Sequence, residues 1–262
     1  MSGYASFAYF YDRLTENVDY RGMAAKIDEW VTRFGGRKGI LLDTACGTGS
    51  LCMELSKLGY DVIGTDSSEE MLGAALDKKF DSGLSIQYLR QDMRSLDMYG
   101  TIDVTVCTLD SVNHLPDEED ALKAFKCVSL FAFPDGMFIF DVNTLHKHRD
   151  VLADNAFVYS LDGLYCGWQN EYDKADSSVH IWLDFFEEED GSWHRYSEDF
   201  REIYISPERI EEMLREAGFE ILGVFGGYTD EPLTENSERA VYVCRKVPTE
   251  QELSDNGINI QE

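Results

Sequence analysis

The stretch that most constrains this 262-residue chain is ILLDTACGTGS, which occupies residues 40–50. Its apolar start predicts a buried strand over residues 39–43, and the apolar spacing over 51–58 predicts a helix. Only small residues separate these two elements. Gly47 and Gly49 therefore leave bare main chain at the end of the strand, where a ligand can approach more closely than side chains would allow.

Strands and helices alternate along the first 142 residues. Helical spacing of apolar residues predicts helices over 21–34 and 117–131, and a capping box of Ser67 and Glu70 predicts another between them. Short apolar runs predict further strands at 61–66, 85–89, 102–108 and 137–142, the last entered through a turn at 134–136. Because the early strands are apolar on both faces, the pattern predicts a doubly wound α/β domain with a parallel sheet.

The pattern changes between residues 143 and 205. Apolar and polar residues alternate strictly over 179–185, and a glycine-containing hairpin turn follows at 189–192. This period predicts an antiparallel β insertion over the open end of the sheet. We therefore divide the chain into an N-terminal helical lid segment (1–36), an α/β domain (37–142 and 206–247), the antiparallel insertion (143–205) and a polar tail (248–262).

The charge and composition of the chain limit the classes of partner that it can bind and the compartment in which we expect it. A formal net charge of -27 and an isoelectric point near 4.4 disfavour a nucleic acid partner. The six cysteines are scattered without the close spacing of a metal or redox motif, so we expect reduced thiols and no metal. The sequence has neither a signal-peptide pattern nor an apolar run long enough to cross a membrane. We therefore expect a cytoplasmic protein.

Two classes of cofactor compete for the glycine-rich loop. A dinucleotide dehydrogenase needs the spacing G-x-G-x-x-G, and no third glycine follows Gly49 at that spacing. Asp43, directly before the loop, suits the amine of a sulfonium amino acid better than a pyrophosphate. Asp66, about 20 residues further on, can accept hydrogen bonds from both ribose hydroxyls in either class, or it could cap the next helix.

The order acid-x-small-x-Gly-x-Gly resembles the signature of class I S-adenosylmethionine-dependent methyltransferases. The stretches LLDTACGTG, GTDSSEEML, QDMRSL, TLDSVNHL and REAGF occur in the order typical of small bacterial members with unassigned substrates, and the resemblance extends to about residue 246. It implies S-adenosylmethionine as the cofactor. It also implies a Rossmann-like fold with a mostly parallel seven-stranded sheet and the antiparallel insertion acting as a lid. Ala45 departs mildly from the signature, which more often has glycine there.

The resemblance also implies roles for particular residues. Asp92 would hold the adenine amino group, and Met93 would cover the ring or lend its amide. Tyr11 would lie near the methyl group, although Tyr11 and Tyr20 could also be core aromatics. The cofactor-binding residues that we predict are Tyr11, Tyr20, Asp43, Ala45, Gly47, Gly49, Asp66, Ser67, Met71, Gln91, Asp92, Met93, Leu109 and Asp110.

Candidates for catalysis and acceptor binding follow the fourth predicted strand or lie in the insertion. His114 is a candidate base, although helix capping explains it equally well, and Tyr11 is the other candidate. Asn113 is a candidate acceptor ligand. Arg195 and Arg201 share one face of a predicted strand, so they could hold an anionic acceptor.

These features together predict an S-adenosylmethionine-dependent methyltransferase that acts on a small molecule. A nicotinamide-dependent oxidoreductase and a scaffold that binds the cofactor without transferring its methyl group remain as alternatives. The sequence does not name the acceptor, its attacking nitrogen, oxygen or carbon, or the oligomeric state.

Overall fold

The computed structural model describes residues 4–249, which are built around two β-sheets. The strands of the larger sheet are β1 (Ile40–Thr44), β2 (Asp61–Asp66), β3 (Ile86–Arg90), β4 (Ile102–Cys107), β5 (Ala132–Asn143), β10 (Phe219–Gly226) and β11 (Arg239–Lys246). They lie in the order β10-β11-β5-β4-β1-β2-β3, and only β11 runs antiparallel to its neighbours. The predicted doubly wound, mostly parallel seven-stranded sheet is therefore confirmed. Most of the polar tail expected at 248–262 lies outside the described residues.

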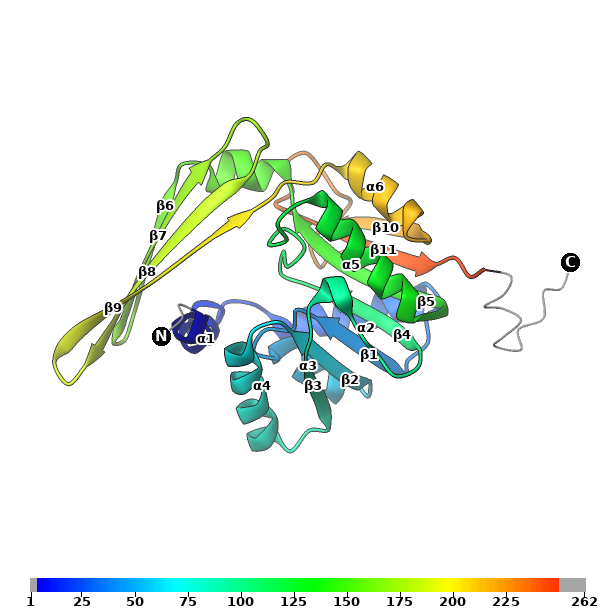
Figure 1. The fold of residues 1–262 in the computed structure, drawn as a ribbon, viewed down its shortest axis with the longest axis horizontal. Helices are drawn as coiled ribbons and strands as arrows, with labels where there is room; N and C mark the ends of the chain where they lie inside the picture. Colours follow the sequence, from blue (N-terminus) through cyan, green and yellow to red (C-terminus); the bar gives the residue numbers. More distant parts are fainter. Residues whose placement is uncertain (1–3, 250–262) are drawn as a thin grey trace, which may run out of the picture.

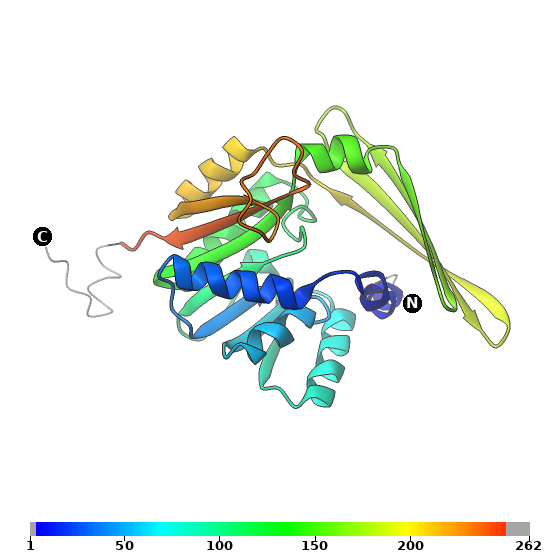
Figure 2. The ribbon, with the colours of Figure 1, turned by 180° about the vertical axis from the view of Figure 1, so that it is seen from behind.

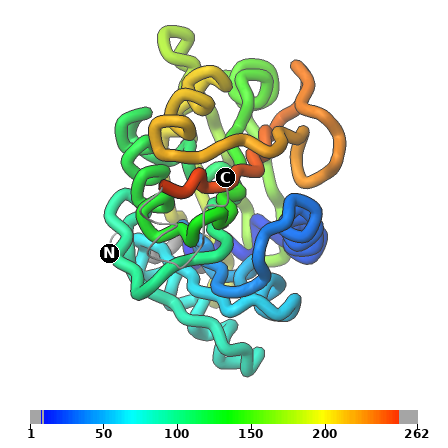
Figure 3. The backbone as a smooth tube through the Cα atoms, turned by 90° about the vertical axis from the view of Figure 1, so that its right-hand side faces the viewer, coloured from blue at the N-terminus to red at the C-terminus, as the bar shows by residue number. Residues whose placement is uncertain are grey.

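Helices cover both faces of this sheet (Figures 1 and 2). They are α2 (Tyr20–Arg33), α3 (Ser50–Lys57), α4 (Glu69–Ser82), α5 (Glu118–Phe131) and α6 (Pro207–Glu216), with a 3-10 turn η1 (Met93–Ser95). One apolar core packs Trp30 of α2 against Leu41, and a second packs Phe125 of α5 and Met213 of α6 on the face of Leu42. Successive residues of β1 thus face different cores, as strand geometry requires. Figure 3 shows the layers from the side, with α2 (blue) and α6 (gold) on opposite sides of β11 (red).

The insertion forms the second sheet, which projects from the α/β domain as a long arm (Figure 1). A π-helical turn η2 (Lys147–Leu152) leads into the antiparallel strands β6 (Ala156–Leu161), β7 (Leu164–Tyr172), β8 (Val179–Glu189) and β9 (Ser192–Glu202). The predicted turn between β8 and β9 falls at Asp190 and Gly191, which both have positive φ. Helix α1 (Tyr4–Leu14) packs against this sheet, because Phe10 stacks on Phe185 with 4.8 Å between ring centroids. The N-terminal helix and the insertion therefore share one apolar core.

Two local predictions are wrong. The capping box expected at Ser67 is displaced by one residue, because Asp66 Oδ1 accepts from Ser68 N at 2.9 Å and so holds Ser67 in a turn. The N-cap is instead Ser68, whose Oγ accepts from Met71 N at 3.1 Å. The turn expected at 134–136 lies inside β5, where the left-handed φ of Asp135 accompanies a register shift against β4.

Among the residues described, none of the helices has the length and apolarity needed to cross a membrane.

Candidate functional site

A cavity of about 390 Å³ lies at the carboxyl ends of β1, β2 and β4. This is the edge where the winding of the sheet reverses and where ligands bind in doubly wound folds. Most of the predicted cofactor-binding residues line it, together with His114: they are Tyr11, Ala45, Gly47, Asp66, Ser67, Met71, Gln91, Asp92, Met93 and Leu109. Tyr20 and Asp43 line a smaller adjoining cavity, whereas Gly49 and Asp110 line neither of the two.

Asp66 joins two parts of the cavity wall. Its Oδ2 accepts a hydrogen bond from Gly47 N and its Oδ1 accepts one from Ser68 N, each at 2.9 Å. Burial raises the pKa of Asp66, and these backbone donors oppose the rise. A single carboxylate thus fixes the glycine-rich loop against the start of α4. Its remaining lone pairs are available to hydroxyl groups of a ligand.

The glycine-rich loop depends on backbone conformations that favour glycine. Gly47 and Gly49 have φ of +54° and +75°. A Cβ on Gly49 would lie 2.2 Å from Tyr88 Oη, and a Cβ on Gly47 would point toward the ring of Tyr11, 4.0 Å away. Ala45 also has a positive φ, +55°, which costs about 1–2 kcal/mol in a residue with a side chain. The loop is therefore held in a strained shape that keeps main chain, not side chains, beside the cavity.

Asp43 is buried behind this loop with an unsatisfied oxygen. Its Oδ2 accepts from the Cys52 thiol at 3.1 Å, whereas Oδ1 has no hydrogen-bond partner among the described residues. The smaller cavity beside Asp43, of about 30 Å³, is shared with Tyr11 and Tyr20. Burial raises the pKa of Asp43 to about 7, while the Cys52 hydrogen bond lowers it and the Asp66 charge raises it. The ammonium group of an amino acid would supply the missing donor, so the residues present fit S-adenosylmethionine.

The residues after β3 form another part of the wall. The Asp92 carboxylate accepts from the Nε and the backbone N of Arg94, both at 2.9 Å, and Arg94 also contacts Asp120 at 2.6 Å. Arg94 lowers the pKa of Asp92, so this carboxylate stays ionised. The Gln91 side chain is bonded to both backbone groups of Asp97. Asp92 is thus fixed at the wall as a hydrogen-bond acceptor.

Tyr11 and Tyr20 bring the N-terminal segment to the loop. Tyr11 lines both cavities, and Tyr20 lines the smaller one. Burial raises the pKa of both phenols, and the charge of Asp110 raises that of Tyr11 further. Tyr11 is therefore a neutral hydroxyl at neutral pH and a poor proton acceptor.

The loop after β4 is held by a buried ionic network. Leu109 and Asp110 both have φ of +55°, and their backbone N–H groups donate to Asp141 at 2.8 and 2.7 Å. Arg239 of β11 forms ion pairs with both Asp110 and Asp141. Although burial opposes it, Arg239 together with His114 keeps the pKa of Asp110 well below its usual range. This network fixes the loop from which His114 projects.

His114 is a titratable group that lines the cavity beside the loop after β4. Its Nε2 lies 3.6 Å from Asp110 Oδ2, and its ring lies 4.8 Å from that of Phe200. Burial lowers its pKa, but Asp110 and Glu202 together raise it above 6.5. Such an imidazole is a stronger proton acceptor than a free one. The ligand atoms of Asp110, His114 and Glu202 lie within 4.8 Å of one another, but Asp110 is already paired with Arg239, so we assign no metal to this group.

The structure places the other acceptor candidates away from the cavity. The Asn113 amide is fully buried, and it donates to Ile203 O at 2.8 Å and accepts from Asn143 N at 3.0 Å. Arg195 pairs with Asp184 through two hydrogen bonds, and Arg201 pairs with Asp176. Neither arginine lines the cavity. The shared face expected for them lies instead on the exposed arm of β9.

The sequence analysis missed three charged residues that support the site: Asp141, Arg239 and Glu202. Asp141 follows an apolar run in β5 just as Asp43 follows one in β1, so its position was a signal that could have identified it. Arg239 and Glu202 had no such signal, because each reaches the site from an element distant in sequence.

Known proteins resemble this chain along nearly its whole length. Residues 41–136 match a family described as the methyltransferase domain. YqeM, a methyltransferase-family protein of Bacillus subtilis (strain 168), is 32% identical over 94% of this chain and 98% of its own length. A methyltransferase-family protein of Geobacillus sp. (strain WCH70) is 31% identical over 93% of this chain and 99% of its own length.

Solved structures agree with this relationship. An S-adenosylmethionine-dependent methyltransferase from Clostridium acetobutylicum superposes with a TM-score of 0.85 at 31% identity, covering 94% of this chain and all of its own. CalS10, an amino pentose methyltransferase from Micromonospora echinaspora described with S-adenosylmethionine bound, shares the fold at a TM-score of 0.72 and 16% identity, covering 91% of this chain and 96% of its own. The chain therefore belongs to the class I S-adenosylmethionine-dependent methyltransferases, with S-adenosylmethionine as its cofactor.

Proposed function

We propose that this methyltransferase acts on an amine nitrogen of a small molecule and that His114 accepts the proton of that amine. The observation that carries the proposal is that His114 and most of the predicted cofactor-binding residues line a single cavity of about 390 Å³. A glycine/sarcosine N-methyltransferase of Parasynechococcus marenigrum, 26% identical over 90% of this chain and 83% of its own length, supports an amine acceptor.

The cofactor side of the proposal assigns one contact to each carboxylate. Asp43 would bind the ammonium group, Asp66 the ribose hydroxyls and Asp92 the adenine amino group. Gly47 and Gly49 would leave room for the methionine part, and Met71 and Met93 would pack on the apolar surfaces. Bound S-adenosylmethionine supplies an electrophilic methyl group on a sulfonium, with a neutral thioether as the leaving group.

The protein's own part in the reaction is positioning, exclusion of water and removal of a proton. Holding the acceptor in line can contribute about 7–11 kcal/mol to lowering the barrier. Tyr11 and α1 would exclude water from one side, and the insertion would do so from the other. A protonated amine has no lone pair, so His114 would have to take its proton before attack. The raised pKa of Tyr11 makes the phenol the weaker candidate for this step.

A small-molecule acceptor is favoured by the net charge of -27, which repels a nucleic acid phosphate backbone. All six cysteines are free thiols, as expected in a reducing compartment, so we place the reaction in the cytoplasm. Arg195 and Arg201 have no part in the proposal. The amine proposal therefore depends on His114 and its neighbours, rather than on an anion site.

The test is to incubate the protein with S-adenosylmethionine carrying a ¹³C-labelled methyl group and a cell metabolite extract. We expect a labelled N-methyl product. The variant His114→Asn should slow its formation by about 10²–10⁴-fold while the affinity for S-adenosylmethionine stays the same. A label on oxygen or carbon would contradict the amine, and a label on RNA or protein would contradict the small-molecule acceptor.

A further inference from the structure

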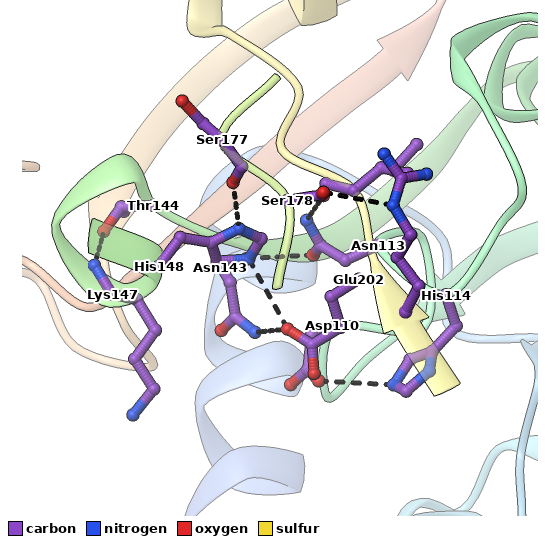
Figure 4. A network of polar contacts seen from close by, with 12 residues as sticks. Asp110, Asn113, His114, Asn143, Thr144, Lys147, His148, Ser177, Ser178 and Glu202 are labelled. Atoms are coloured by element: carbon purple, nitrogen blue, oxygen red, sulfur yellow. Dashed lines mark hydrogen bonds and ion pairs between the residues drawn. The ribbon is translucent and has the colours of Figure 1, made fainter. Parts of the chain in front are cut away.

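Glu202, the last residue of β9, brings a buried carboxylate from the insertion to His114 (Figure 4). Two hydrogen bonds between the neighbouring residues Asn113 and Ile203 fix this position. Ile203 N donates to Asn113 O and Asn113 Nδ2 donates to Ile203 O, both at 2.8 Å. Because Asn113 and Ile203 are joined in this way, their chain neighbours His114 and Glu202 are brought together, with ligand atoms within 4.8 Å.

The far side of the Glu202 carboxylate is fixed as well. Its Oε2 accepts from Asn143 Nδ2 at 2.8 Å and lies 3.4 Å from His148 Nε2. The other ring nitrogen of His148 lies 2.9 Å from the carbonyl oxygen of Ser177, which can only accept a hydrogen bond. The carboxylate is thus held by groups of β5, η2 and the insertion. It cannot turn away from His114 without breaking these contacts.

The charged groups that face His114 come from two elements. Asp110 lies in the loop after β4 and Glu202 lies at the end of β9, while Phe200 of β9 covers the ring with an apolar face. Arg239 of β11 acts on this group through its ion pair with Asp110. One Arg239 is shared between Asp110 and Asp141, and Glu202 adds a further carboxylate near His114 that would stabilise its protonated form.

We infer that Glu202 is a positioning residue for His114: the insertion supplies a carboxylate whose negative charge lies near the imidazole and strengthens it as a proton acceptor. The inference rests on the proposed function only for the source of the proton, which passes from the ammonium nitrogen of the acceptor to the imidazole. The antiparallel insertion then supports the chemistry itself.

The test follows the Cε1–Hε1 NMR signals of the histidines in the free protein across a pH series, with His114→Asn to assign the signal. Glu202→Gln keeps an acceptor for Asn143 but removes the charge. We expect it to lower the His114 midpoint by about one pH unit, and Glu202→Asp to restore part of that shift. Asp199→Asn is the matched control, because Asp199 lies on the same strand, 2.9 Å from His180. It should leave the His114 midpoint unchanged.

An unchanged His114 midpoint in Glu202→Gln, with the backbone NMR spectrum preserved, would overturn the inference. If Glu202→Gln does not fold, Glu202→Asp decides the question, because a shorter carboxylate should lower the His114 midpoint by less than one pH unit. An unchanged midpoint in Glu202→Asp would then contradict the inference.

Zinc chloride is the probe for a competing role, since micromolar zinc binding that needs Glu202 would make the group a metal site. These measurements use the free protein without an acceptor. A negative result would therefore overturn the role of Glu202, whereas only the labelling experiment can overturn the amine acceptor.

Discussion

The protein holds each of the three carboxylates that we propose bind the cofactor in a different way. Asp66 accepts from two backbone amides, and Asp92 is paired with Arg94. Asp43 has an oxygen with no donor among the described residues, and burial raises its pKa to about 7. A buried carboxyl of this kind is protonated in part near neutral pH. It is therefore the group whose ionisation changes most when a cation binds beside it.

We predict that binding of S-adenosylmethionine releases close to one proton at pH 6, because Asp43 there is mostly protonated and the ligand's ammonium group favours the ionised form. The release should decline as the pH rises through about 7. Calorimetric titration in buffers of different ionisation enthalpy measures it. Asp43→Asn should abolish the release, and an equal proton count in the variant would contradict the assignment.

At the scale of elements, one lysine of α4 joins α1 to the glycine-rich loop. Lys78 Nζ contacts Asp12 of α1 at 2.5 Å, Thr48 of the loop at 3.0 Å and Ser50 of α3 at 2.8 Å. Thr48 in turn donates to Asp12 at 2.6 Å. Because Phe10 also anchors α1 to β8, one short helix connects the glycine-rich loop with the insertion. Its docking should therefore govern access to the cavity.

We predict that Lys78→Gln increases hydrogen exchange over residues 4–14 several-fold and weakens S-adenosylmethionine binding only slightly. A partly exposed ion pair contributes about 0.2–1 kcal/mol, which corresponds to a few-fold change. Hydrogen-exchange mass spectrometry measures the effect, and Lys79→Gln on the same helix is the control. Exchange that is the same in both variants would show that Lys78 does not hold α1.

At the scale of the whole molecule, the surface carries far more acid than base. The chain has 50 acidic residues and 23 lysines and arginines, so more than half of the acids lack a cation of their own. Mutual repulsion of these charges should destabilise the folded protein at low ionic strength. The observed ion pairs are mostly at the surface, where each contributes little.

We therefore predict that the melting temperature rises as sodium chloride increases from 10 mM to 500 mM, because the Debye length shortens from about 30 Å to a few ångströms and screens the repulsion. Differential scanning fluorimetry across a salt series measures this change. A melting temperature that falls with salt would mean that the ion pairs outweigh the repulsion.

Much of this architecture follows from local patterns. Short apolar runs predicted the first five strands of the α/β domain, and the Asp-Gly turn at residue 190 predicted the β8–β9 hairpin, because both signals lie within a few adjacent residues. The glycine-rich loop and its acids predicted residues that line the cavity, among them Gly47, Asp66 and Asp92. The even spacing of Arg195 and Arg201 along a strand could not show where they lie. It shows that two residues share one face of the strand, but not which part of the protein or solvent that face contacts. Glu202 was missed because it meets His114 only after the insertion folds back onto the loop after β4.

The central claim is that the glycine-rich loop and Asp66 bind S-adenosylmethionine, and calorimetric titration of the purified protein tests it most directly. We predict one-to-one binding of S-adenosylmethionine and none of NAD. Asp66→Ala should weaken it by about 10- to 100-fold, the equivalent of about 1.5–3 kcal/mol for a charged hydrogen-bond acceptor. Asp61→Ala, at the opposite end of β2, should leave it unchanged. Absence of S-adenosylmethionine binding, or equal affinity in Asp66→Ala, would contradict the account.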